Sequence, residues 1–268
     1  MSGTFELIHH DAHGEKAWKR FTGYQFARGI PVAQLAAPEI SKAALSMPLA
    51  FMQVGEAVSL VAVCGLLPEQ NLFIAPDGRW LGAYVPAVFR GYPFKLARSG
   101  DNNFALCIDT TSGLLVERDQ GEALFNDDAT PTETVQQVMQ LLVQTTKGQE
   151  ALSQAATALS QAGVLEPWPI KIKDGDKERD VTGLLRVNEQ SLNGLDDQAF
   201  LALRKVGGLQ VAYAQLLSSA NIGVLAQLEQ VHGEIQKRQD AANAEHQRLF
   251  QPNGGDNGTI DWSRIFNN

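Results

Sequence analysis

Cysteine is scarce in this sequence, which has two among its 268 residues, Cys64 and Cys107. Both lie inside apolar runs, LVAVCGLL and FALCID, where a cysteine ordinarily serves as a small buried hydrophobic residue. Two cysteines are too few for the disulfide framework of a small secreted domain. We therefore expect reduced thiols and a cytoplasmic protein.

Long hydrophobic runs are also missing. The most apolar stretch, AVSLVAVCGLL at residues 57–67, is far shorter than the roughly 20 residues that a membrane-spanning helix needs. The segment MSGTFELIHHDAH carries acids and histidines where a signal peptide has a basic segment and then an apolar one. We expect no membrane span and no export signal.

Positive charge is in deficit, since 22 Lys and Arg face 30 Asp and Glu, for a net charge of -8. Binding to a phosphate backbone depends on clustered basic side chains, so nucleic acid is excluded as an expected partner. The sequence contains no G-x-S-x-G, P-loop, G-x-G-x-x-G or H-E-x-x-H motif. It favours a protein that is not an enzyme and that has no cofactor.

The first half is rich in short β-type runs. Three of them predict strands of an antiparallel meander: residues 47–54, 57–66 and 71–75. Gly55-Glu56 permits a tight hairpin between the first two. Two further runs, residues 79–97 and 102–117, continue the sheet.

Helical signals follow. Thr130-Pro131-Thr132-Glu133 has the pattern of a capping box, and apolar spacing then continues to Gly163, with Gly148 as a break. This predicts a helix pair over residues 131–163 that covers the sheet.

A second hairpin is predicted near residues 168–187, around the polar turn Asp174-Gly175-Asp176. Asp196 can cap a short helix that ends at Gly207-Gly208, and residues 209–250 predict a long C-terminal helix. The fold class is therefore α+β. We expect one domain over residues 1–250, followed by a flexible linker and an apolar tail at 251–268.

Several segments resemble the SapC-like family, which is named for an S-layer-associated gene cluster of bacteria and also occurs in some phages. They are NLFIAPDGRWLGAYVPAVFRGYPFKLA, LCID, GEALF, GLLRVNEQSLNGL and LRKVGGLQVAYAQLLSSANIGVLAQL. The resemblance covers roughly residues 18–230 and is most specific from Trp80 to Phe94. It implies a link to surface-layer or export processes through gene context, and it implies no catalytic residue.

Aromatic and arginine side chains are concentrated in residues 79–94. Guanidinium groups beside aromatic rings can form a pocket for a carboxylate or phosphate. The ligand-binding candidates are Arg79, Trp80, Tyr84, Arg90, Tyr92 and Phe94. Alternatively, the aromatic residues pack the sheet, and the two arginines pair with acids such as Asp77 and Asp109.

The histidines His9, His10 and His13 stand beside Asp11, and imidazole with carboxylate suits zinc or nickel. The segment has no regular pattern that would fix the geometry of ligands. They are therefore weak metal candidates, and we expect no metal site.

The tail carries four large apolar residues, Ile260, Trp262, Ile265 and Phe266, and the last three share one face if the segment becomes helical. They can dock in a groove of a partner, dock on the protein's own surface, or have no function. A stripe formed by Leu217, Val224, Leu228, Val231 and Ile235 can form the seam of a homodimer, or can pack on the protein's own sheet.

The sequence thus favours a non-enzymatic binding or adaptor protein for a protein or peptide partner. The alternative is a small-molecule enzyme or sensor that uses residues 79–94. A concave pocket in which Arg79 or Arg90 lacks an acidic partner would favour a small ligand, and two paired arginines would favour the adaptor.

Overall fold

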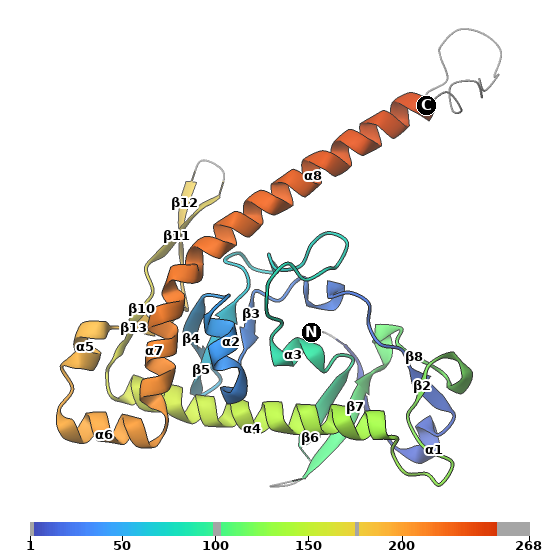
Figure 1. Cartoon of the computed structure of the whole chain (residues 1–268), viewed down its shortest axis with the longest axis horizontal. Coiled ribbons are helices and arrows are strands. Elements are labelled where there is room, and N and C mark those ends of the chain that lie inside the picture. Colours follow the sequence, from blue (N-terminus) through green and yellow to red (C-terminus); the bar gives the residue numbers. More distant parts are fainter. Residues whose placement is uncertain (1–2, 99–102, 175–176, 251–268) are drawn as a thin grey trace. The chain divides into compact units, whose positions relative to one another are not determined.

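The computed structural model describes residues 3–98, 103–174 and 177–250 (Figure 1). Contacts divide the chain into two compact units, residues 1–228 and 229–268. The first unit holds the sheets, both hydrophobic core clusters and the pockets discussed below. The second contains the end of helix α8, Ile222–Phe250, which begins in the first unit.

The central sheet has five strands in the order β10-β13-β4-β5-β3, and all of its pairs are antiparallel. The strands are β3 (Val32–Gln34), β4 (Leu49–Val54), β5 (Ala57–Val63), β10 (Leu165–Pro167) and β13 (Leu185–Val187). The predicted β4–β5 hairpin is confirmed, and Gly55 takes the positive φ of +63° that its turn requires. This sheet lies in the larger core cluster, around Phe51 and Leu60.

Three smaller sheets complete the β structure of the described residues. Their strands are β1 (Phe5–Leu7), β7 (Phe104–Asp109) and β6 (Phe94–Arg98) in one sheet, β8 (Leu115–Glu117), β2 (Lys16–Trp18) and β9 (Glu122–Ala123) in another, and the hairpin of β11 (Ile170–Asp174) with β12 (Lys177–Val181). The last pair confirms the predicted second hairpin.

The prediction of a strand at residues 71–75 is wrong, because these residues form no strand. Ile74 makes only an isolated bridge to Trp80. The buried Asn71 side chain holds the segment instead, because it donates to the Ala27 carbonyl oxygen and accepts from the Phe73 N–H. The apolar run is buried without strand pairing, which hydrophobicity alone does not distinguish from a strand.

The prediction of a helix pair is also wrong, because the segment forms one helix, α4 (Glu133–Gln161). This helix runs along the central sheet at β5 (Figure 1). Gly148 does not interrupt it. A Cβ at Gly148 would lie 2.9 Å from the Ala36 Cβ and 3.0 Å from the Ala37 nitrogen. The glycine therefore permits close packing between α4 and the short helix η2 (Ala37–Glu39).

The start of α4 also differs from the expected capping box. Thr132, not Thr130, is the N-cap residue, and its hydroxyl donates to the Ala123 carbonyl oxygen 2.9 Å away. Pro131 instead forms an isolated bridge with Phe125. The tertiary contact with β9 replaces the local cap.

The C-terminal part of the first unit is helical. It contains α5 (Glu189–Asn193), α6 (Asp197–Lys205), α7 (Gly208–Ser218) and the 3-10 turn η5 (Ser219–Asn221) before α8. The predicted cap of α6 is confirmed, since Asp196 accepts from the Ala199 N–H at 2.8 Å. The expected C-terminal helix is present, with η5 separating α7 from α8.

The residues of the stripe proposed as a dimer seam differ in their exposure to solvent. Leu228 is buried in the larger core cluster and Val224 packs against it, whereas Leu217 is 79% exposed. Among the described residues, no helix is long and apolar enough to cross a membrane. The tail candidates Ile260, Trp262, Ile265 and Phe266 lie outside the described residues.

Candidate functional site

A pocket of about 370 Å³ lies beside the smaller core cluster of the first unit. It is lined by Trp18, Arg20, Phe21, Arg90, Gly91, Tyr92, Phe94, Thr134, Gln137, Val138 and Leu141. These residues come from β2 and the loop after it, from the end of α3 (Ala87–Arg90) and the turn that leads to β6, from β6 itself and from the first half of α4. We call this hollow the Arg90 pocket. Its size is in the range of small-ligand sites.

Trp18 forms the buried wall of the Arg90 pocket. It ends strand β2 and pairs with Leu115 and Glu122 in the neighbouring strands. Its ring meets that of Phe94 edge to face, with centroids 4.8 Å apart. Trp18 is 5% exposed, and its indole N–H is a buried side-chain donor with no partner among the described residues. Buried donors of this kind are rare, because leaving one unpaired costs about 1–3 kcal/mol.

The two arginines of the pocket differ in whether a carboxylate neutralises their charge. Arg20 forms an ion pair with Glu122 at 2.6 Å, and this contact holds the pKa of the Glu122 carboxyl below its ordinary value. Arg90 forms no ion pair with a carboxylate of the described chain and donates instead to the Tyr84 hydroxyl at 3.2 Å. The uncompensated charge in the lining is therefore the Arg90 guanidinium.

A buried carboxylate orients Arg90 indirectly. Glu39 is 4% exposed and accepts from the backbone N–H groups of Ala36 and Ala87, at 2.8 and 2.7 Å. It also accepts from the Tyr84 hydroxyl at 2.8 Å, and that hydroxyl in turn accepts from Arg90. The Tyr84 hydroxyl therefore lies between Glu39 and Arg90, and the two charged groups form no direct ion pair.

Both tyrosines of this region are harder to ionise than usual. Desolvation, followed by the hydrogen bond to Glu39, raises the pKa of Tyr84 to about 12. Desolvation also raises the pKa of Tyr92, and the nearby negative charge of Asp109 adds to the effect. Both phenols are therefore neutral near pH 7 and can serve as hydrogen-bonding groups.

The structure divides the six residues predicted as ligand-binding candidates. Arg90, Tyr92 and Phe94 line the pocket. Tyr84 stands behind Arg90, and Trp80 stacks on Phe73 and donates to the Tyr84 carbonyl oxygen.

Arg79 lies outside the pocket lining and pairs with Asp77 at 2.7 Å, as the structural alternative predicted. The other alternative pairing is not present, because the Asp109 carboxylate accepts from the backbone N–H and the hydroxyl of Thr111. Arg79 is therefore paired with an acid, whereas Arg90 lines a pocket and has no acidic partner in the part of the chain that the structure describes.

Sequence reasoning missed part of the pocket and the residue that supports Arg90. The missed residues are Trp18, Arg20 and Phe21, those contributed by α4, and Glu39. The run WKRF at residues 18–21 has the same mixture of aromatic and basic side chains as residues 79–94, so composition could have indicated it. No local signal distinguishes Glu39 from an exposed glutamate.

The histidine segment has structural contacts. His13 is 3% exposed and its Nδ1 lies 3.3 Å from the His9 carbonyl oxygen, while the His10 ring packs edge to face on Phe125. Across residues 3–98, 103–174 and 177–250, no group of three or more His, Cys, Asp or Glu side chains is arranged to hold a metal ion.

Fold and pocket together define an α+β protein with a ligand-sized hollow next to its smaller core. The chain belongs to the SapC family, whose model matches residues 8–225. The match includes the whole Arg90 pocket and Glu39. No curated protein and no solved structure matches the chain.

Proposed function

We propose that this chain is a binding protein whose Arg90 pocket takes a small organic anion. A carboxylate or phosphate of the ligand pairs with Arg90, and its apolar part packs against Trp18, Tyr92 and Phe94. The observation that carries the proposal is the Arg90 guanidinium, which faces this pocket without an acidic partner in the described chain. Guanidinium groups favour such oxyanions because they offer paired donors in a plane.

One further feature supports an anionic ligand. Thr134 and Gln137 come from the start of the 29-residue helix α4, whose N-terminal end carries partial positive charge.

The lining supports binding better than acid–base catalysis, because none of its side chains is a carboxylate, imidazole or thiol. The cytoplasm is part of this proposal, since Cys64 and Cys107 are buried free thiols.

Calorimetry with phenyl phosphate and with inorganic phosphate tests the proposal on the full chain. Phenyl phosphate is expected to bind more tightly, because its ring adds contact with the aromatic wall. Arg90→Ala should weaken this binding about tenfold or more, since a hydrogen bond to a charged group contributes about 1.5–3 kcal/mol.

Arg79→Ala is the matched control, because Arg79 is an exposed arginine of the same segment with a partner of its own. It should leave phenyl phosphate binding unchanged, and neither variant should lower the melting temperature much. Equal effects of the two variants, or a large loss of stability in Arg90→Ala alone, would refute the proposed role of Arg90.

A further inference from the structure

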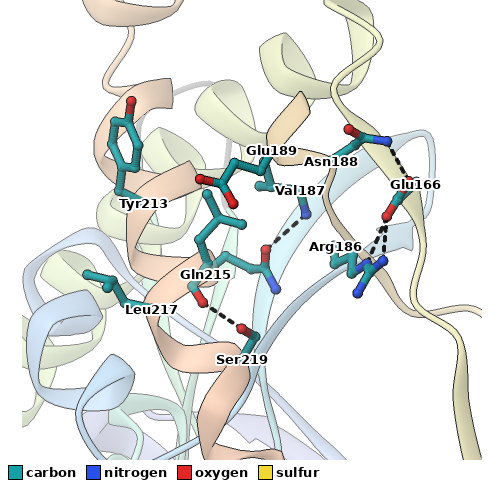
Figure 2. A pocket seen from close by; sticks show the side chains of 10 residues that line it. Glu166, Arg186, Val187, Asn188, Glu189, Tyr213, Gln215, Leu217 and Ser219 are labelled. Carbon is teal, nitrogen blue, oxygen red and sulfur yellow. Dashed lines mark hydrogen bonds and ion pairs between the residues drawn. The ribbon is translucent and has the colours of Figure 1, made fainter. Parts of the chain in front are cut away.

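A second hollow, of about 670 Å³, lies where two neighbouring strands of the central sheet separate (Figure 2). Strands β13 and β4 pair only at Leu185 and Phe51. The lining residues are Glu166, Arg186, Val187, Asn188, Glu189, Tyr213, Gln215, Leu216, Leu217 and Ser219. We call this hollow the Glu189 pocket. It shares no lining residue with the Arg90 pocket.

Gln215 forms the floor of the Glu189 pocket and fills the gap between the strands. Its side chain is on α7 and is 1% exposed. The amide oxygen accepts from the Val187 N–H at 2.9 Å, as Figure 2 shows, and the amide nitrogen donates to the Leu49 carbonyl oxygen at 3.3 Å. Gln215 thus replaces missing strand pairing, and both ends of its amide are occupied.

Glu166 and Arg186 also line the Glu189 pocket, and their opposite charges neutralise each other. Glu166 accepts from Arg186 at 2.8 Å and from the Asn188 side chain at 2.6 Å. The hydrogen bond from Arg186 is the main reason why the pKa of the Glu166 carboxyl lies below its ordinary value. This ion pair adds no net charge to the pocket.

Three groups of the lining remain available to a ligand. The Glu189 carboxylate and the Tyr213 hydroxyl make no hydrogen bond or ion pair with other described residues. Glu189 is not required as a helix cap, because Asn188 already accepts from the Ser191 N–H. Tyr213 is 45% exposed, and Leu217 is 79% exposed. They lie one turn apart on α7 and project from the same side of it in Figure 2.

We propose that the Glu189 pocket binds a lysine or arginine side chain presented by an extended segment of a partner protein. Once Glu166 and Arg186 cancel, the formal charge of the lining is that of the Glu189 carboxylate, so its complement is a cation. The ring of Tyr213 favours the same ligand, because cations are attracted to the faces of aromatic rings. The aliphatic stem of the basic side chain can lie along Leu216.

The exposed Leu217 indicates that the ligand belongs to a polypeptide. A free amine would use the carboxylate and the ring but would leave this leucine in water. An aliphatic residue next to the basic one in a partner segment would cover it. The net charge of -8 attracts basic segments at long range, which raises their rate of association.

Fluorescence anisotropy with a labelled, amidated peptide of sequence Gly-Leu-Lys-Leu-Gly tests the inference on the full chain. Saturable binding is expected, and replacing the peptide's lysine by glutamate or norleucine should weaken it about tenfold or more. Glu189→Gln should produce a similar loss. Leu217→Ser should weaken binding severalfold, because it removes exposed apolar surface of the site.

Two control variants separate the site from general effects. Glu56→Gln removes an exposed carboxylate in the β4–β5 turn, and Val54→Ser shortens an exposed aliphatic side chain at the end of β4. Both should bind the peptide as the unchanged protein does, with equal melting temperatures throughout.

The inference is overturned if Glu189→Gln and Glu56→Gln lose the same affinity, or if the peptide with glutamate binds as well as the one with lysine. Binding of n-butylamine or spermidine as tight as that of the peptide would overturn the assignment to a partner protein. Because Arg90 is absent from this pocket, the outcome does not depend on the phenyl phosphate experiment.

Discussion

The Tyr84 hydroxyl donates to the Glu39 carboxylate over 2.8 Å and accepts a hydrogen bond from Arg90 on its other side. One phenol thus joins a buried anion to an exposed cation without bringing them into direct contact. Tyr84→Phe should lower the free energy of unfolding by about 2 kcal/mol, because the buried Glu39 loses one of its donors. Urea denaturation measures this loss.

Tyr213→Phe is the control for that experiment, since it removes a tyrosine hydroxyl that is without a partner in the described chain. Its free energy of unfolding should stay within about 0.5 kcal/mol of the unchanged protein. Similar stability of the two variants would show that the contact with Glu39 contributes nothing.

Ionisation of Tyr84 should also lower the stability of the fold at alkaline pH. Its pKa rises from an ordinary value of 10.0 to about 12 in the folded protein, so the fold favours the neutral phenol. The contribution to stability is complete below pH 10 and is lost as the pH rises from 10 to 12, because the unfolded chain ionises first. Melting temperatures over this range should fall less steeply in Tyr84→Phe.

Gly148→Ala should destabilise the protein even though alanine is the better helix former. The new Cβ would lie 2.9 Å from the Ala36 Cβ, and relieving such overpacking costs about 1–3 kcal/mol. Gly223→Ala is the matched change in α8, where a Cβ meets nothing within 4 Å. That variant should be neutral or more stable by up to about 1 kcal/mol in thermal unfolding.

The dimer seam remains a prediction that light scattering can test. Leu217 is exposed, and Val231 is 38% exposed, whereas Leu228 is already buried in the core of its own unit. If the exposed members form an interface, the protein should have the mass of a dimer at micromolar concentration, and Val231→Glu should reduce it to a monomer. A monomeric mass of the unchanged protein would end this hypothesis.

Sequence patterns were sufficient for features whose cause is local. The β4–β5 hairpin depends on a glycine that accepts positive φ, and the start of α6 depends on the Asp196 cap. Apolar periodicity likewise predicted the long helices and the α+β class. The same reasoning misread Gly148 as a break, because the residues that require a glycine there are far away in the sequence.

The candidate site could be predicted only in part. The composition of residues 79–94 predicted a ligand pocket, and three of the six candidates, Arg90, Tyr92 and Phe94, line the Arg90 pocket. It could not show that Arg79 has an acidic partner whereas Arg90 has none among the described residues, since both are arginines beside aromatic residues. Charge balance depends on which carboxylates the fold brings within reach.

The sequence by itself determined the α+β class, the main helices and the hairpins, because turns, caps and apolar periodicity act over a few residues. Tertiary structure alone decided the rest. Glu39 meets Tyr84 across 45 positions of the chain, and Gln215 reaches Leu49 across 166. Such contacts form only when sheets and helices pack, so the two pockets and their unbalanced charges are products of packing.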